Sequence, residues 1–252
     1  MTKIKLISDI HIDSYDHILN DSVGVNFIKT IPNENVDILV LAGDIVTGGY
    51  IERYYDLFEA MSDRFEETVM VLGNHDNYRH SMQEVRDIMS GFCTKLPSNF
   101  HWLDNTKKEI KGIPFVGSTL WFPEILNMTG KMGWVDFRYV KGGCWPIFEE
   151  FRKAKQFLAE NVDKNSVVIT HHMPSHKCVH ERYIGDDYNC FFVGDVENVI
   201  LEKKPKLWLH GHSHEPLNGL KIGDTYCYRN PRSYPGENML FDPNFLIDTK
   251  DF

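Results

Sequence analysis

The chain has 252 residues, of which 42% are hydrophobic and 25% are charged, as is usual for a globular protein, and we expect a single domain over residues 1–252. Its 27 basic and 36 acidic side chains give a formal net charge of −9, which disfavours a broad nucleic-acid-binding surface. No apolar run reaches the roughly 18 residues of a membrane span, and no signal segment is recognisable. Five cysteines without a Cys-x-x-Cys pair indicate a reducing compartment, so we expect a cytoplasmic protein without a membrane partner.

The first half of the chain repeats one pattern: a short apolar run, a polar cluster and a helical stretch. The apolar runs at residues 3–8, 36–42 and 68–72 have the length and composition of buried central strands. Residues 50–65 and 81–90 have helical composition, and the second of these stretches begins with a capping box. Because strands that alternate with helices form βαβ units, we predict an α/β fold with ligands beyond the carboxyl ends of its strands.

The second half of the chain is less regular. Short strands around turns are predicted over residues 100–104, 109–110 and 113–120, which favours a more antiparallel sheet there. Residues 121–145 are rich in aromatic residues, Gly and Pro without a clear period, so they form either a substrate-facing loop or a packed structural excursion. The remaining predicted elements are an amphipathic helix over 147–162, strands at 167–169 and 207–209, a short helix near 196–201 and tail strands from residue 219.

Polar clusters follow five of the predicted strands. They are Asp9-x-His11, Gly43-Asp44, Gly73-Asn74-His75-Asp76, His171-His172 and His212-x-His214. Residues i and i+2 at a strand end point the same way, so both side chains of an x-spaced pair can reach one ion. Imidazole, carboxylate and amide donors without thiolates suit Mn, Fe, Zn, Co or Ni and exclude a structural zinc finger. Seven of these residues are candidate ligands: Asp9, His11, Asp44, Asn74, His171, His212 and His214. Because seven ligands are more than one tetrahedral ion needs, we predict two divalent metal ions that share Asp44.

Together these motifs resemble the calcineurin-like metallophosphoesterases, whose pattern is Asp-x-His, Gly-Asp, Gly-Asn-His-Asp or -Glu, a single His, and Gly-His-x-His. The matches span residues 3–214, and residues 230–237 are similar to a tail segment of that family. The resemblance implies two facing mixed β-sheets flanked by helices. It also implies two overlapping ligand sets, Asp9, His11, Asp44 and His214 for one ion and Asp44, Asn74, His171 and His212 for the other.

The single histidine of the family pattern is either His171 or His172 in this chain. We favour His171 because it directly follows the predicted strand. His172 would then lie beside the ligands or face the substrate, and it is our first candidate for a substrate contact. Arg232 is the second, as a phosphate-binding side chain, with Arg229 and the loop residues His176, His180, Arg182 and Tyr183 as further candidates.

The expected reaction is phosphoester hydrolysis. A hydroxide that bridges two cations is the expected nucleophile, because metal coordination can lower the pKa of water to near 7. His75 follows a candidate ligand, and imidazole is the side-chain group most often used for proton transfer near neutral pH, so we expect His75 to donate a proton to the leaving oxygen. Asp76 or Asp44 would orient the His75 ring.

Motifs that the chain lacks narrow the substrate class. Protein serine/threonine phosphatases of this superfamily carry arginines beside the metal motifs, where this chain has Leu72 and Ile45, and purple acid phosphatases have a ligating tyrosine where it has Thr47. We therefore expect a phosphodiesterase that acts on a nucleotide or other small phosphodiester, with manganese favoured. The alternatives are a phosphomonoesterase and a non-enzymatic binding module that retains metal. The sequence leaves the oligomeric state open.

Overall fold

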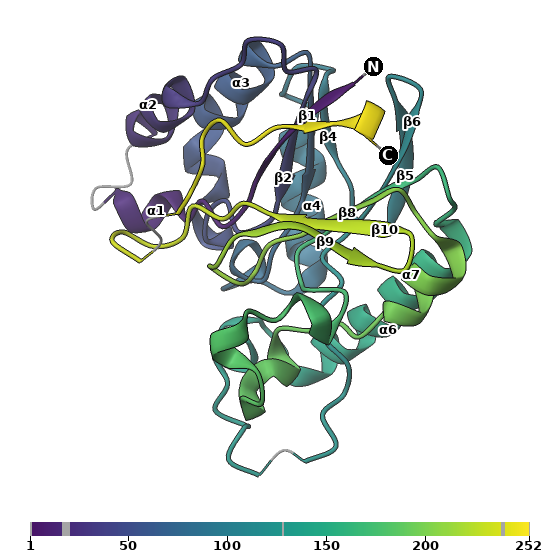
Figure 1. The fold of residues 1–252 in the computed structure, drawn as a ribbon. Helices are drawn as coiled ribbons and strands as arrows, with labels where there is room; N and C mark the ends of the chain where they lie inside the picture. The colour runs from purple at the N-terminus through teal and green to yellow at the C-terminus, as the bar shows by residue number, and fades with distance from the viewer. Residues whose placement is uncertain (1, 17–20, 128, 238–239, 252) are drawn as a thin grey trace.

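Two β-sheets pack face to face between helices in the computed structural model, which describes residues 2–16, 21–127, 129–237 and 240–251 (Figure 1). The first sheet has the strand order β11-β1-β2-β3-β4, and all but β11 run parallel. Its strands are β1 (Lys3–Ile7), β2 (Ile38–Ala42), β3 (Glu67–Val71), β4 (Phe100–Trp102) and β11 (Ile247–Asp248).

The second sheet has the order β5-β6-β7-β8-β10-β9, in which the four central strands are parallel and the two edge strands antiparallel. Its strands are β5 (Thr106–Ile110), β6 (Ile113–Ser118), β7 (Val167–Thr170), β8 (Leu207–Leu209), β9 (Leu217–Ile222) and β10 (Thr225–Arg229). Both sheets are mixed and the fold is α/β, as the resemblance implied.

Helices cover the outer face of each sheet. Helices α2 (Ser22–Thr30), α3 (Tyr55–Arg64) and α4 (Met82–Cys93) pack on the first sheet, while α6 (Cys144–Asn161) and α7 (Glu197–Lys203) pack on the second (Figure 1). The shorter helices are α1 (Ile12–Tyr15), α5 (Val135–Tyr139) and the 3₁₀ segments η1 (Gly48–Tyr54), η2 (His75–Asn77), η3 (His176–Cys178), η4 (Glu181–Tyr183), η5 (Asp187–Phe191) and η6 (Thr249–Asp251). In the part of the chain that is described, no helix is long and apolar enough to cross a membrane.

Three apolar layers hold this architecture together. Leu6, Val40 and Ile169 belong to the layer between the sheets, and each is fully buried. Phe58 of α3 lies in the layer between the first sheet and its helices, and Trp208 of β8 lies in the layer under α6 and α7. Since removing apolar surface from water stabilises a fold in proportion to area, these layers make the sheets a rigid support for the loops at their edges.

Three features differ from the sequence predictions. The middle of the chain does not form a predominantly antiparallel sheet, because β6 pairs in parallel with β7 and only its other neighbour, β5, is antiparallel. The predicted helix over residues 50–65 is divided into the 3₁₀ segment η1 and the α-helix α3. Helix α2 was missed, and it is positioned by tertiary packing: a Cβ on Gly24 would lie 3.0 Å from Leu57 of α3.

Candidate metal centre

All seven candidate ligands lie in loops at the carboxyl ends of strands, where the two sheets meet. Six of them, together with His75, form three clusters whose donor atoms lie within 4.8 Å of one another, a spacing that could hold a metal ion. The clusters are Asp9, His11 and His214; His11, Asp44 and His75; and Asp44, His171 and His212. Six of the seven candidates are at most 8% exposed, so the donors are largely withdrawn from bulk water.

The backbone of these loops is held in an unusual conformation. Asp9, His11, Asp44 and His212 have φ values of 52°, 43°, 56° and 70°, in the left-handed region that non-glycine residues rarely adopt. Backbone hydrogen bonds fix the loops to each other, because Asp9 N donates to Gly43 O at 2.9 Å and His11 N donates to Asp44 O at 3.0 Å. The ligand directions are therefore set before any ion binds.

Glycines in two of the motifs are required by close approach. A Cβ on Gly73 would lie 2.1 Å from Asp44 Oδ1, and a Cβ on Gly43 would lie 2.4 Å from His171 Nδ1. Gly43 also has a φ of 86°. These positions exclude a side chain because the candidate ligands pass directly against the backbone.

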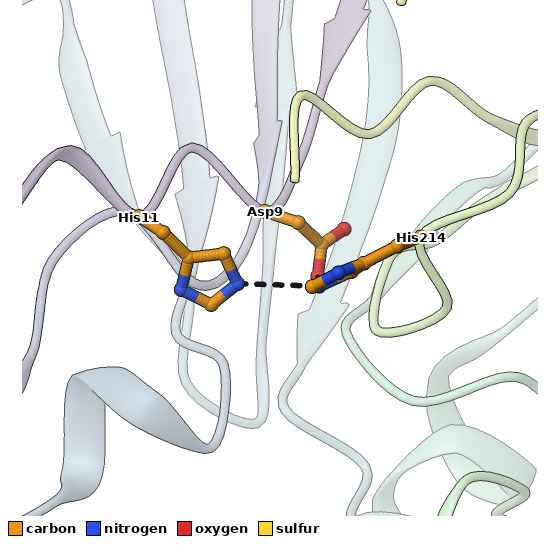
Figure 2. Close-up of side chains that lie close together, drawn as sticks. All are labelled: Asp9, His11 and His214. Atoms are coloured by element: carbon orange, nitrogen blue, oxygen red, sulfur yellow. Dashed lines mark hydrogen bonds and ion pairs between the residues drawn. The ribbon is translucent and has the colours of Figure 1, made fainter. Parts of the chain in front are cut away.

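His11 and His214 converge on Asp9 from opposite directions (Figure 2). Their Nε2 atoms are 3.3 Å apart, and His214 Nε2 lies 3.8 Å from Asp9 Oδ1. The other nitrogen of His214, Nδ1, is 2.6 Å from Glu237 Oε2, which assigns its proton to Nδ1. The Nε2 lone pair is thus directed into the cluster, as in metal sites where a carboxylate orients a ligating imidazole.

His171 is oriented in the same way. Its Nδ1 donates to Ala42 O at 2.8 Å, while its Nε2 faces Asn74 Oδ1 at 2.9 Å and Asp44 Oδ2 at 3.4 Å. His172 is fully buried, and its Nδ1 contacts Thr119 O at 3.2 Å. The structure groups His171, rather than His172, with Asp44 and His212.

The charges of the centre fit bound cations. Within the described residues, the ion pairs of Asp9 and Asp44 are with histidine rings only. Burial raises the pKa of Asp44, but the charges of His171 and His75 outweigh it and hold that pKa well below its usual range. Conversely, burial lowers the pKa of His171, but the Asp44 charge raises it to about 9. Buried carboxylates that draw protons onto neighbouring imidazoles are sites where divalent cations can replace those protons.

His75 and Asp76, the two predicted catalytic residues, have different surroundings. His75 is half-buried, its ring lies 4.7 Å from that of His11, and its Nε2 lies 3.2 Å from the hydroxyl of Tyr234. Asp76 is fully buried and accepts the backbone N–H groups of Gly73, Asp44, Ile45 and Val46 at 2.7, 2.8, 3.1 and 3.0 Å. Asp76 therefore ties two ligand-bearing loops together, and no hydrogen bond among the described residues joins it to the His75 ring.

A family model described as calcineurin-like phosphoesterase matches residues 2–216. The chain belongs to the calcineurin-like phosphoesterase family. It is therefore a metal-dependent phosphoesterase.

Individual proteins resemble this chain in sequence or in fold. The phosphoesterase is 25% identical over 280 residues to the uncharacterized protein L509 of Acanthamoeba polyphaga mimivirus, with 98% of this chain and 97% of that protein covered. Its fold is similar to that of the phosphopantetheinyl hydrolase PptH from Mycobacterium tuberculosis, with a TM-score of 0.67, 14% identity and coverage of 97% and 98%. A dimetal phosphatase from Danio rerio has a TM-score of 0.52, 13% identity and coverage of 90% and 86%.

A cavity of about 420 Å³ opens beside the candidate ligands of this phosphoesterase. Asp44, Asn74, His212 and His214 line its inner end together with His75. The rest of its wall is formed by Trp134, Val135, Met173, Tyr183, Asp186, Tyr188, Asn189, Phe192, Ser213, Glu215, Tyr234 and Glu237. The segment 121–145 combines the two roles weighed for it, since Trp121 is buried in the core while Trp134 and Val135 face the cavity.

The expected substrate contacts lie mostly outside this cavity. Arg232 is not among the lining residues, because its guanidinium lies 3.6 Å above the Tyr15 ring and 3.8 Å above the Phe27 ring. His172 is buried behind the candidate ligands, and Arg229 is 1% exposed with its Nε donating to Glu215 O at 2.6 Å. None of these three side chains is among the described residues that line the cavity, and a role for them in substrate binding stays a prediction. Of the four loop candidates, only Tyr183 lines the cavity.

Asp136 and Tyr234 were missed by the sequence analysis. Asp136 is fully buried, and its Oδ1 accepts from Asn74 Nδ2 at 2.8 Å and from Tyr78 OH at 2.6 Å. Its Oδ2 accepts from Trp134 Nε1 at 2.7 Å, so one carboxylate connects a candidate ligand to the cavity wall. Tyr234 stacks on His11 with ring centroids 4.3 Å apart, and the family-like tail segment at residues 230–237 was the signal that could have identified it.

Proposed function

We propose that residues 1–252 form a single domain that binds two divalent metal ions and hydrolyses a small phosphodiester. The observation that carries the proposal is the convergence of buried imidazole, carboxylate and amide donors at the inner end of one cavity. Asp9, His11, Asp44 and His214 would hold one ion, and Asp44, Asn74, His171 and His212 the other. Donors of this kind accept several first-row ions, among which we favour manganese.

The bound ions would supply an acidified water as nucleophile and neutralise charge that develops on the phosphoryl oxygens. His75 would donate a proton to the leaving oxygen. Its ring lies against His11, and its Nε2 is within hydrogen-bond distance of the Tyr234 hydroxyl. A half-buried imidazole at the inner end of the cavity meets the geometric requirement for a general acid, which must reach the leaving group.

The substrate is proposed to be a diester because the cavity extends well past the candidate ligands. Its outer wall offers room and aromatic surface for an organic group in addition to the phosphoryl group. A nucleotide is one candidate for such a substrate. A phosphomonoesterase remains the alternative. The non-enzymatic binding module weighed from the sequence is set aside, because the chain belongs to the calcineurin-like phosphoesterase family. The free cysteines support the proposed cytoplasmic location.

The decisive experiment uses metal-stripped protein reconstituted with Mn²⁺. Turnover of bis(p-nitrophenyl) phosphate and p-nitrophenyl phosphate is measured in parallel, with Asp44→Ala as the control. We expect the diester to be hydrolysed with the higher kcat/KM and the control to lose turnover. Preference for the monoester would favour the phosphomonoesterase. Absence of turnover with both esters, despite two bound metal ions per chain, would indicate an enzyme that is restricted to other phosphoesters.

A further inference from the structure

The outer part of the cavity has an uneven charge. The lining contains three carboxylates beyond the candidate ligands, those of Asp186, Glu215 and Glu237, of which Glu237 lies 2.6 Å from His214 Nδ1. Among the described lining residues there is no Lys or Arg. Arg182 lies nearby, but it is 62% exposed, pairs with Glu215 at 3.1 Å and stacks on the Tyr183 ring at 4.5 Å. A second phosphate group in this part of the cavity would therefore meet carboxylates rather than a cationic side chain.

Hydrogen-bond donors in the wall are largely engaged with the protein itself. Tyr183 OH donates to Glu215 Oε1 at 3.1 Å, and Ser213 Oγ donates to Glu215 Oε2 at 3.0 Å. Asn189 Nδ2 donates to Tyr183 O at 2.7 Å, and Trp134 Nε1 is taken by a buried carboxylate. The carboxylates of Asp186, Glu215 and Glu237 also take part in hydrogen bonds with the protein, but each carboxylate has about four lone-pair sites, so the wall keeps more acceptor than donor capacity for a ligand. Such a wall suits a group that brings positive charge or N–H donors.

Aromatic rings form much of the remaining wall. Trp134 is fixed against Phe191, with ring centroids 4.2 Å apart and an interplanar angle of 4°. Tyr188 stacks on Trp134 at 5.7 Å and is 48% exposed, and Phe192 lies against His212 at 4.6 Å. Rigid aromatic faces beside carboxylates are the combination that binds organic cations, through the ring quadrupole and through charge.

We propose that the outer cavity binds the organic substituent of the phosphoester and selects a compact organic cation, of the quaternary ammonium class, over neutral and anionic groups. This inference rests on the proposed function, since it concerns which phosphodiester the same site accepts. The phosphoryl group lies at the inner end, and the cationic substituent lies against the Trp134–Tyr188 stack and beside the carboxylates. Substrates with further phosphates, such as nucleoside polyphosphates, are disfavoured by the same charges.

The test compares four diesters that share the p-nitrophenyl leaving group. The cationic member is p-nitrophenyl phosphorylcholine, and the p-nitrophenyl ester of 3,3-dimethylbutyl phosphate is its uncharged isostere, with carbon in place of nitrogen. The p-nitrophenyl ester of thymidine 5′-phosphate provides a nucleoside, and a 3-carboxypropyl phosphate ester provides an anion. We expect kcat/KM for the cation to exceed that of its isostere by about fivefold to twentyfold, with the anion lowest.

Two variants test whether the cavity wall is responsible for the preference for the cationic ester. Asp186 Oδ1 accepts the backbone N–H of Tyr188 at 2.8 Å, a bond that the amide oxygen of Asp186→Asn can also accept. This variant removes one charge from the wall, and we expect the cation-to-isostere ratio to fall by about twofold to fivefold. Asp187→Asn is the matched control, because Asp187 is exposed and does not line the cavity, and its ratio should equal that of the wild type.

A binding measurement separates this inference from the proposed function. Choline and 3,3-dimethylbutanol are titrated into metal-stripped protein and followed by NMR, and choline should bind more tightly by a similar factor. If no ester is hydrolysed, the proposed function fails and this titration alone decides whether the cavity selects cations. If the esters are hydrolysed with equal kcat/KM for cation and isostere, or with preference for thymidine, the inference is overturned while the hydrolase stands.

Discussion

Two regions of this phosphoesterase meet at the cavity, and they are built on different principles. The ligand loops (residues 8–11, 43–44, 73–76, 171–172 and 211–214) are short, follow strands directly and are fixed by backbone hydrogen bonds. The cavity lobe (described residues within 121–145 and 173–192) lies below the sheets in Figure 1 and has only short helical segments. Side-chain packing, such as the Trp134–Phe191 stack, holds it together.

This difference allows a fold to retain its reaction while its substrate changes. In the ligand loops a residue's role follows from its distance to a strand end, so few substitutions preserve the chemistry. In the cavity lobe the role depends on which side chains from distant segments meet, so the wall can be rebuilt without moving the ligands. Substitutions in the two regions should therefore have separable effects.

The largest expected effect that preserves the metals comes from His75→Ala. We expect both metal ions to remain bound, because all seven candidate ligands are intact. We expect kcat to fall by about 10²–10⁴-fold, because the proton donor is lost. Metal content by mass spectrometry and steady-state kinetics check this. A p-nitrophenyl leaving group needs little protonation, so an alkyl diester should show the larger loss. Unchanged turnover with both esters would remove His75 from the mechanism.

Gly73→Ala tests the rigidity of the ligand loops. The new methyl group would lie 2.1 Å from Asp44 Oδ1 and 2.5 Å from Asp44 N, so Asp44 must move. Since a displacement of about 1 Å at a reacting centre can cost about 10²-fold, we expect a loss of that order in kcat/KM with weakened metal binding.

The matched control is Gly91→Ala in α4, where a Cβ meets nothing within 4 Å. This substitution should leave activity unchanged and raise the free energy of unfolding by about 0.5–1 kcal/mol, because Ala is the better helix former. If Gly73→Ala were as active as Gly91→Ala, the ligand loops would be more adaptable than their contacts indicate.

The same contrast explains how far the sequence was informative. Apolar runs that end in Asp or His locate strand ends, and the structure brings the residues after them together as candidate metal groups. Asp136 carried no such signal, because it meets Asn74 across 62 residues of sequence through packing of α5. Arg232 was predicted to bind phosphate because of its residue type, but nothing in the sequence indicated that its guanidinium lies over the rings of Tyr15 and Phe27.

Asp136→Asn examines the point where the two regions touch. The carboxylate accepts from Asn74, Tyr78 and Trp134, and an amide NH₂ group in its place would oppose at least one of these donors. Residues that orient a metal ligand typically contribute about 10–100-fold to metal affinity or activity, and we expect a loss in that range. Manganese titrations and kcat/KM measure it.

Trp134→Phe separates the contact of Asp136 with Asn74 from its contact with the cavity wall. It removes only the donor to Asp136 Oδ2 and keeps an aromatic ring in the cavity wall. We expect KM to rise for diesters with bulky substituents, while manganese affinity stays that of the wild type. Equal loss of manganese affinity in both variants would mean that the cavity lobe, and not Asp136 alone, holds Asn74 in place.

The smallest effect on activity is expected from Ser81→Ala, at the start of α4 and outside both regions. Ser81 Oγ accepts from Glu84 N at 3.3 Å, and Glu84 Oε2 accepts from Ser81 N at 2.7 Å, the capping box that the sequence predicted. Loss of the cap should lower the free energy of unfolding by about 1 kcal/mol, measured by urea denaturation, with kcat/KM unchanged.

The pH dependence of unfolding provides the control for this cap. Hydrogen bonding to Lys141, and then to the Ser81 backbone, lowers the pKa of Glu84 to about 2 from its usual value near 4.5. A carboxyl group whose pKa is lowered by folding stabilises the fold at pH values above its pKa in the unfolded chain. This stabilisation is lost as the pH falls from 4.5 toward 2. Lys141→Met should flatten that part of the profile more than Ser81→Ala does, since Lys141 makes the larger contribution. A change of kcat/KM in either variant would mean that α4 is coupled to the ligand loops and does not act as a scaffold alone.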